Sequence, residues 1–336
     1  MVQTSNIHPD KIMKKDIRVS YKNFWPGFDR TRMPQDYFFD FVLSHRYNIV
    51  NDDVNPDVIF YSVFGAIPPN ANSYKRKPLM VGISAEPFPV NGQHDFVIGY
   101  GYGAENCLRL PLWVMYIIWD KHTLDTNYKI LNNPNIGQGC HHTPGYFIAG
   151  DNGGKQNPLF ITNVLNRHLN NKPKTKFCNF TYTNPVDNRI DFFIRLSRYK
   201  QVDSTGTVLN NTGYRMVSKS RELGDYKFTI AFENSVLPGY VTEKIFEPLA
   251  AGSVPLYFGD DSVKTDFNPK AFINVKDFRN FSEALKYVEE VDKNEELYNS
   301  YLNQPIFENA DSVLSYPEKV FNKLYSELIK ERPELA

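Results

Sequence analysis

The chain contains two successive series in which short apolar segments alternate with helical patterns. The first includes apolar runs at 57–63 and 78–84, and the second includes strand-like segments at 227–234 and 253–259. The run 111–120, which opens on a proline, predicts a buried helix in the first series. Short apolar strands that alternate with helices are typical of parallel sheets covered on both faces. The sequence therefore predicts an α/β fold with two Rossmann-like domains.

A polar stretch with a proline, residues 170–174, separates the two series. We therefore expect an N-terminal domain over 1–172 and a second domain over 173–310. The amphipathic segment at 311–336 predicts a final helix that packs back on the N-terminal domain. Residues 121–156 are rich in Asn, Gly and His and show no periodicity, which predicts a long loop.

Composition narrows the classes of partner. The 336 residues include 38 Lys and Arg and 38 Asp and Glu, so the formal net charge is zero. Nucleic-acid-binding proteins usually carry a basic surplus, so we expect no nucleic acid partner. The three cysteines are widely spaced and form no CxxC pair, which favours a reduced, cytoplasmic setting. No apolar run predicts a transmembrane segment; peripheral contact with an inner membrane and the oligomeric state stay open.

The segment 232–245, FENSVLPGYVTEKI, joins a strand end, a Pro-Gly turn and a helix start. Ligands of open α/β sheets bind at the carboxyl ends of strands, and a helix N-terminus there suits a pyrophosphate. Lys244 would add a positive charge, Glu243 can accept hydrogen bonds from ribose hydroxyls, and Tyr240 can stack or donate. The competing interpretation is a helix cap with surface charges, in which Thr242 is only an N-cap.

The string FENSxxxGYVTEKI resembles the donor-site signature of the α-1,3-fucosyltransferases, glycosyltransferase family 10. Its continuation, 252–278, resembles the bacterial branch of that family. Residues 17–25 resemble the family's first strand, 39–49 its first helix, and 107–116 a later helix of the acceptor domain. The resemblance extends from about residue 16 to 310.

This resemblance implies the GT-B architecture, in which two Rossmann-like domains face each other across a cleft. The C-terminal domain would bind GDP-fucose, and the N-terminal domain would bind an oligosaccharide acceptor. The implied reaction moves L-fucose, with inversion, to a sugar hydroxyl, O3 of an N-acetylglucosamine or glucose unit in a β-galactoside-containing glycan. It implies no metal and no other cofactor.

The resemblance also implies catalytic roles for three residues. Glu86 follows a predicted strand and corresponds to the family's proposed base, although it could instead be a surface carboxylate. Arg189 and Lys244 would stabilise the charge that develops on the GDP leaving group. For Arg189, a solvated charge on a helix face is the competing interpretation.

The donor pocket implied by the resemblance comprises Asn234, Tyr240, Thr242 and Glu243, together with the two cations. The same residues would also be compatible with a GT-B transferase for a different nucleotide sugar, or with an inactive sugar-binding protein of the same fold.

The first predicted strand ends in an aromatic pair that carries a weaker expectation. Phe24 and Trp25 could stack on the acceptor sugar, or they could pack in the core.

Overall fold

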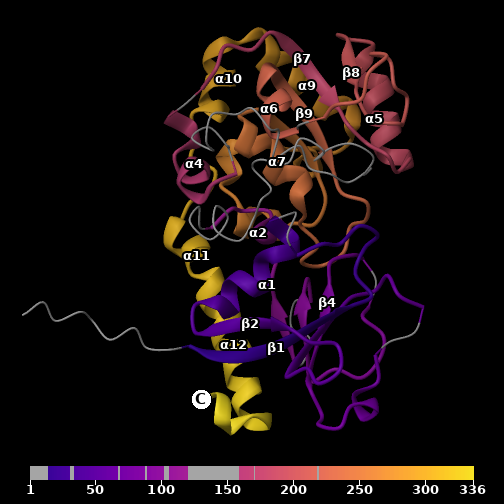
Figure 1. The fold of residues 1–336 in the computed structure, drawn as a ribbon. Coiled ribbons are helices and arrows are strands. Elements are labelled where there is room, and N and C mark those ends of the chain that lie inside the picture. Colours follow the sequence, from indigo (N-terminus) through magenta and orange to yellow (C-terminus); the bar gives the residue numbers. More distant parts are fainter. Residues whose placement is uncertain are drawn as a thin grey trace, which may run out of the picture.

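The computed structural model describes residues 14–30, 34–66, 69–87, 89–101, 106–119, 159–169, 171–217 and 219–336 (Figure 1). The chain forms two halves, each built around a parallel sheet. The N-terminal half lies at the bottom of Figure 1 and the C-terminal half at the top. The predicted fold class, α/β with two Rossmann-like halves, is confirmed.

The N-terminal sheet has the strand order β2-β1-β3-β4-β5-β6, and all neighbours are parallel. Its strands are β1 (Lys15–Lys22), β2 (Tyr47–Asn51), β3 (Val58–Tyr61), β4 (Leu79–Ser84), β5 (Phe96–Gly99) and β6 (Cys107–Arg109). The described α-helices up to residue 169 are α1 (Pro34–Ser44), α2 (Leu112–Met115) and α4 (Ile161–Leu165). Because parallel strands run in one direction, β1, β3, β4 and β5 all end at the same edge of this sheet.

The C-terminal sheet has the order β11-β10-β9-β7-β8, again entirely parallel. Its strands are β7 (Lys176–Phe180), β8 (Val202–Ser204), β9 (Tyr226–Phe232), β10 (Val254–Phe258) and β11 (Ile273–Asn274). The helices are α5 (Asp187–Ser197), α6 (Lys219–Glu222), α7 (Glu243–Ala251), α8 (Val263–Asp266), α9 (Phe281–Lys293), α10 (Glu295–Leu302), α11 (Ala310–Leu314) and α12 (Tyr316–Glu331).

The largest apolar core is shared between the two halves. It joins side chains of the N-terminal sheet and α1 to side chains of α7 and α12, among them Val81, Phe39, Ile245, Phe246 and Leu324. Trp113 of α2 is fully buried at this junction, and its ring packs against Phe267 and Phe307 with centroid distances of 4.9 and 5.2 Å. Burial of this much apolar surface holds the halves in a fixed relation.

The C-terminal helix α12 belongs to the chain's second half in sequence but contacts α1 and β4 of the first. In Figure 1 it runs down beside the N-terminal sheet to the C-terminus. Two hydrogen bonds attach the C-terminal end of the chain to the N-terminal half. Tyr47 Oη donates to the Leu335 carbonyl (2.9 Å), and Arg332 Nε donates to Asp57 Oδ1 (3.1 Å).

The helix predicted over 111–120 is wrong beyond its first turn, since α2 ends at Met115. After it, Ile118 N donates to the Leu159 carbonyl and Ile161 N donates to the Ile118 carbonyl. This strand-like pairing takes the place of further helical hydrogen bonds. Residues 107–116 are likewise not one helix, because β6 pairs with β5 and only the short helix α2 follows it. The predicted loop over 121–156 lies outside the described residues.

Candidate active site

The segment after β9 forms the turn and helix start that the sequence predicts. Gly239 has φ +77°, a left-handed conformation that glycine adopts without strain. Thr242 then caps α7, because its Oγ1 accepts a hydrogen bond from the Lys244 backbone N–H at 3.3 Å. The helix ends at Ala251, and Gly252 caps it with φ +83°. This arrangement places the N-terminus of α7, with its positive dipole end, directly after the sheet's carboxyl edge.

Lys244 lies at this helix start among three oxygen-bearing side chains. Its Nζ is 3.1 Å from Glu243 Oε1, 3.2 Å from Thr242 Oγ1 and 3.7 Å from Glu233 Oε2. Burial acts to lower the pKa of Lys244, but the carboxylates of Glu243 and Glu233 outweigh it and raise that pKa above its usual range. The ammonium is therefore held in its charged form at the N-terminus of α7.

Glu233 was not among the predicted site residues, although it stands inside the motif. Its side chain is fully buried, and its two oxygens accept hydrogen bonds from Thr242 N (2.8 Å) and Thr242 Oγ1 (2.7 Å). Burial raises the pKa of Glu233 to about 7, and the Lys244 ammonium limits that rise. Glu233 therefore fixes the position of the cap residue and neighbours the cation.

Arg189 is fully buried on α5, beneath the turn. Its Nη2 donates to the Phe232 carbonyl (2.7 Å) and to Asn234 Oδ1 (3.0 Å), and its guanidinium lies 3.9 Å from the ring centre of Tyr182. Burial raises the pKa of Tyr182 to about 12, while the charges of Arg189 and Lys244 oppose that rise. The two predicted cations thus flank one tyrosine, and Arg189 positions Asn234. Nη1 donates to the Asn184 carbonyl at 3.1 Å, and the expected contact of Arg189 with phosphate stays a prediction.

Glu86 follows β4, at the carboxyl edge of the N-terminal sheet, and is partly buried. Burial and the negative charge of Glu243 raise the pKa of Glu86, and Lys244 partly offsets this rise. The charges of α7 therefore act on a carboxyl group that belongs to the other half of the chain.

A tyrosine that the sequence did not single out holds this part of the N-terminal half against the turn. Tyr100, just after β5, donates from its hydroxyl to the Ala85 carbonyl at 2.8 Å. Its ring packs edge to face on Tyr240, with ring centroids 4.7 Å apart. Because Tyr240 is only 2% exposed in this arrangement, its predicted contact with the donor stays a prediction.

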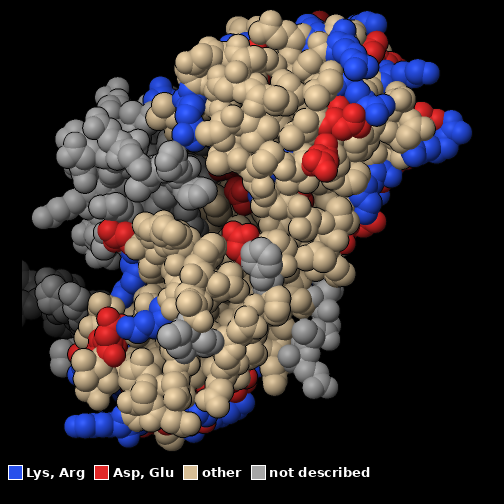
Figure 2. All heavy atoms as spheres, turned by 90° about the vertical axis from the view of Figure 1, so that its right-hand side faces the viewer, with Lys and Arg blue, Asp and Glu red and all other residues tan. Residues whose placement is uncertain are grey.

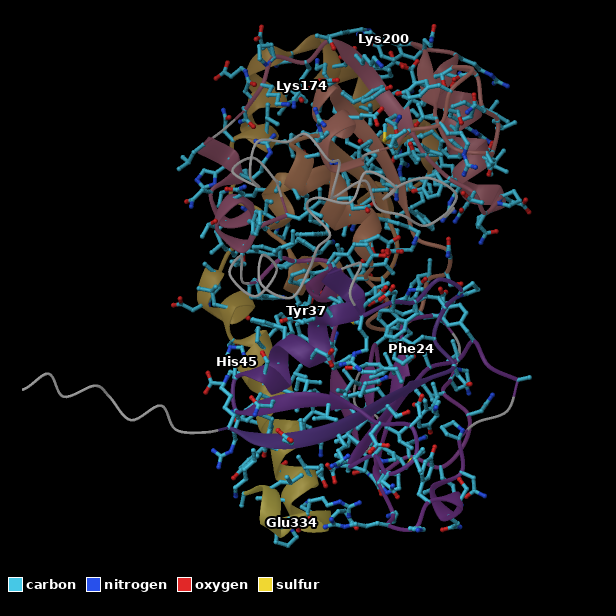
Figure 3. All side chains as sticks on the ribbon, viewed as in Figure 1. Phe24, Tyr37, His45, Lys174, Lys200 and Glu334 are labelled. Atoms are coloured by element: carbon cyan, nitrogen blue, oxygen red, sulfur yellow. The ribbon has the colours of Figure 1, made fainter. Side chains whose placement is uncertain are left out.

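Phe24 and Trp25 belong to an aromatic cluster that begins at the end of β1. Phe24 packs against Tyr21 and Phe28, with centroid distances of 5.6 and 4.2 Å, and Trp25 meets the edge of the partly exposed Phe64 at 6.2 Å. In Figure 3, Phe24 lies in the part of the N-terminal half that is nearer the C-terminal half. Phe24 therefore combines core packing with a place near the sheet's carboxyl edge.

Charged side chains from both halves come close to one another at the junction of the halves. Figure 2 shows a hollow between them, with acidic side chains at its walls. Among the described residues, no group of three or more His, Cys, Asp or Glu side chains is placed to hold a metal ion. Within the same ranges, no helix combines the length and the apolar character needed to span a bilayer. Across this junction, the carboxyl group of Glu86 interacts electrostatically with Glu243 and Lys244 at the N-terminus of α7.

The chain is similar to known fucosyltransferases. Residues 169–322 match the model of the glycosyltransferase family 10 (fucosyltransferase) C-terminal region. The chain is 30% identical to the alpha-(1,3)-fucosyltransferase FucT of Helicobacter pylori over 307 residues, which covers 89% of this chain and 61% of that protein. It is 35% identical to the human GDP-fucose protein O-fucosyltransferase 3 over 130 residues, 35% of this chain and 27% of that protein. The chain thus spans less than two thirds of these curated relatives.

A solved structure of an alpha1,3-fucosyltransferase with GDP-fucose has the same fold, with a TM-score of 0.64 and 24% identity. The match covers 94% of this chain and 93% of that one. Residues 169–322 thus match the C-terminal region of the glycosyltransferase family 10 fucosyltransferases, and over most of its length the chain is similar to an alpha-(1,3)-fucosyltransferase.

Proposed function

We propose that the chain transfers L-fucose from GDP-fucose to a sugar hydroxyl, with inversion at the anomeric carbon. One observation carries the proposal: Glu86, from the N-terminal half, lies within electrostatic reach of Glu243 and Lys244 at the N-terminus of α7. A single displacement needs a base on one side of the reacting carbon and a stabilised leaving group on the other. The family match over the C-terminal half supports a GDP-sugar as the donor.

The leaving group would be stabilised by α7. As the bond between fucose C1 and the β-phosphate oxygen breaks, GDP departs with the electron pair and gains negative charge. The free N–H groups and dipole of the helix start stabilise that charge, and the Lys244 ammonium adds a full positive charge beside them. Glu243 would bind the ribose, and Arg189 would hold Asn234 and the turn in place.

The base would be Glu86. The acceptor hydroxyl attacks fucose C1 from the face opposite GDP, and its proton passes to the Glu86 carboxylate. The raised pKa of Glu86 brings it closer to the working pH, which favours proton transfer in the transition state. The β-linked donor thereby becomes an α-L-fucoside.

We propose O3 of an N-acetylglucosamine or glucose unit, in a β-galactoside-containing glycan, as the acceptor position. The similarity to the alpha-(1,3)-fucosyltransferase of Helicobacter pylori supports this choice. Phe24 and Trp25 would offer an aromatic face to the acceptor sugar. A cytoplasmic setting is part of this proposal.

Two experiments test the donor and the acceptor separately. Thermal shift measurements with GDP-fucose, GDP-mannose and UDP-sugars should show stabilisation by GDP-fucose and, less strongly, by GDP-mannose. Incubation with GDP-fucose and a panel of β-galactosides and peptides, followed by linkage analysis of products, should give an α-1,3-fucoside. Stabilisation by UDP-sugars alone, or GDP-fucose binding without turnover on any acceptor, would contradict the proposal.

A further inference from the structure

The site holds one ammonium between two carboxylates, and this charge balance has to change when the donor binds. Lys244 Nζ lies 3.1 Å from Glu243 and 3.7 Å from Glu233. The cluster of these three side chains therefore carries a net negative charge when both carboxylates are ionised. The diphosphate of GDP-fucose adds two more negative charges beside them. Like charges in one poorly solvated site favour the uptake of a proton by one of the acids.

Of the two carboxylates, Glu233 is the one placed to accept that proton. Its side chain has no exposed surface, whereas that of Glu243 is 14% exposed. Burial raises the pKa of Glu233 to about 7. Burial also acts on Glu243, but Lys244 and Lys219 outweigh it and lower the pKa of Glu243. A further negative charge at Lys244 would push the pKa of Glu233 upward through neutral pH.

The other charged or titratable groups around Glu233 come from six elements. They are Lys244 and Glu243 of α7, Tyr240 of the turn, Tyr257 of β10, Arg189 of α5, Tyr182 after β7, and Tyr100 after β5. Burial raises the pKa of each of these tyrosines, so they stay neutral near pH 7. Lys244 keeps its proton because the two carboxylates raise its pKa.

The surroundings of Glu233 accommodate a neutral carboxyl group as well as a carboxylate. The Thr242 hydroxyl at 2.7 Å can either donate or accept. The Tyr257 hydroxyl is buried near the Glu233 side chain and has no hydrogen-bond partner within the described ranges. Gly259 leaves this space open, because a Cβ there would collide with the Tyr257 hydroxyl and lie 2.8 Å from Glu233 Cγ.

We propose that Glu233 is a positioning residue of the donor site that takes up one proton from solvent when the diphosphate of the donor binds beside Lys244. This rests on the proposed function, since it takes GDP-fucose as the ligand. In the free protein the carboxylate orients Thr242 and Lys244. In the complex the neutral form of Glu233 no longer pairs with the Lys244 ammonium, which then interacts with the phosphates.

Isothermal titration calorimetry with GDP-fucose, in buffers of different ionisation enthalpy, measures this proton directly. GDP-fucose suits the test because both of its phosphates are esterified and do not titrate near neutral pH. At about pH 7.5 the wild-type protein should take up roughly half to one proton per donor bound, and its affinity should fall by up to about tenfold per pH unit above that pH. Glu233→Gln should show no uptake, and at about pH 8.5 it should bind GDP-fucose at least as tightly as the wild type.

Two matched variants identify the source of the proton. Asp292→Asn removes another buried carboxylate of the same half, one bonded to Lys227 (2.7 Å) and Lys200 (2.9 Å), and should leave the uptake unchanged. Glu86→Gln should also keep the uptake, because the proton goes to Glu233.

The possible failures are distinguishable. Binding without proton uptake by the wild type overturns this inference and leaves the proposed function standing. Uptake that persists in Glu233→Gln, or weaker binding by that variant at every pH, also overturns it. If GDP-fucose does not bind at all, the proposed function fails as well. Binding without uptake by the wild type overturns the inference even if the Glu233 variant does not fold.

Discussion

Tyr100 and Tyr240 meet edge to face between the two halves of the chain, with ring centroids 4.7 Å apart and an interplanar angle of 65°. Tyr240 belongs to the turn that leads into α7, and the Tyr100 hydroxyl holds the Ala85 carbonyl at 2.8 Å. The residue after Ala85 is the proposed base, Glu86. One aromatic contact therefore links the loop that carries the proposed base to the turn that carries the proposed leaving-group site.

Removal of the Tyr100 hydroxyl should slow transfer without abolishing donor binding. In Tyr100→Phe the ring can still pack on Tyr240, but the Ala85 carbonyl loses its donor and the loop of Glu86 gains freedom. We expect kcat to fall by roughly ten- to a hundredfold, since small misplacements of reacting groups are costly. The control is Tyr61→Phe, which removes a hydroxyl that donates to the Gln93 carbonyl at 3.0 Å in the same half. Both variants should lose about 1–2 kcal/mol of stability; equal kcat values for the two would contradict the positioning role.

The two halves are also joined by a bidentate ion pair. Arg109 Nη1 and Nη2 each lie 2.7 Å from an oxygen of Asp266, whose side chain is 1% exposed. Asp266→Asn should lower the free energy of unfolding in urea by about 3–5 kcal/mol, because it leaves a poorly solvated guanidinium with a neutral partner. In contrast, Asp277→Asn, which breaks the exposed pair with Lys264, should cost at most about 1 kcal/mol. Similar losses of unfolding free energy for both variants would show that the Arg109–Asp266 pair contributes no more to stability than an exposed ion pair.

The C-terminal end of α7 depends on a glycine for two separate reasons. Gly252 has φ +83°, and a Cβ at this position would collide with the Arg167 guanidinium. Gly213 has φ +74° but has nothing within 4 Å of such a Cβ. Gly213→Ala should therefore lower the free energy of unfolding only by the cost of placing alanine in a left-handed conformation, about 1–2 kcal/mol. Thermal and urea unfolding should show a loss for Gly252→Ala that exceeds this by at least about 1 kcal/mol; equal losses would mean that Arg167 moves away freely.

The parts of the fold that the sequence predicted are those in which burial dominates. β3, β4 and β9 are buried along almost their whole length, and their apolar runs predict strands directly. In contrast, β2 and β8 lie at the edges of their sheets, and neither strand was predicted. β2 reads YNIVN and β8 has three residues, VDS, so neither has an apolar run.

In the candidate site, too, only the features that local sequence determines could be predicted. Thr242, Glu243 and Lys244 are adjacent in sequence, and the motif predicts their helix-start position. The role of Tyr100 depends on a contact with a residue 140 positions away, which no local pattern encodes. The spacing of Arg189 predicts a charge on a helix face. In the structure its side chain is buried, where it donates to the Phe232 carbonyl and contacts the Tyr182 ring.

The pH dependence of the reaction should report on Glu86. A base has to be deprotonated, so kcat/KM should fall as the pH drops through the pKa of Glu86, which burial and Glu243 raise above its ordinary value of 4.5. Glu243→Gln removes the negative charge and should move this acidic limb to lower pH, even though donor binding weakens. The pH–rate profile of the two proteins checks this. An acidic limb at the same pH in both would mean that Glu243 does not act on the base.

The most direct test of the proposed mechanism is the transfer rate of Glu86→Gln, measured together with its dissociation constant for GDP-fucose. The variant keeps the shape of the side chain but cannot accept the proton of the acceptor hydroxyl. We expect kcat to fall by about 10²–10⁴-fold, while the dissociation constant for GDP-fucose stays within about threefold of the wild type. A transfer rate equal to that of the wild type would contradict the assignment of the base and, with it, the single-displacement mechanism across the two halves.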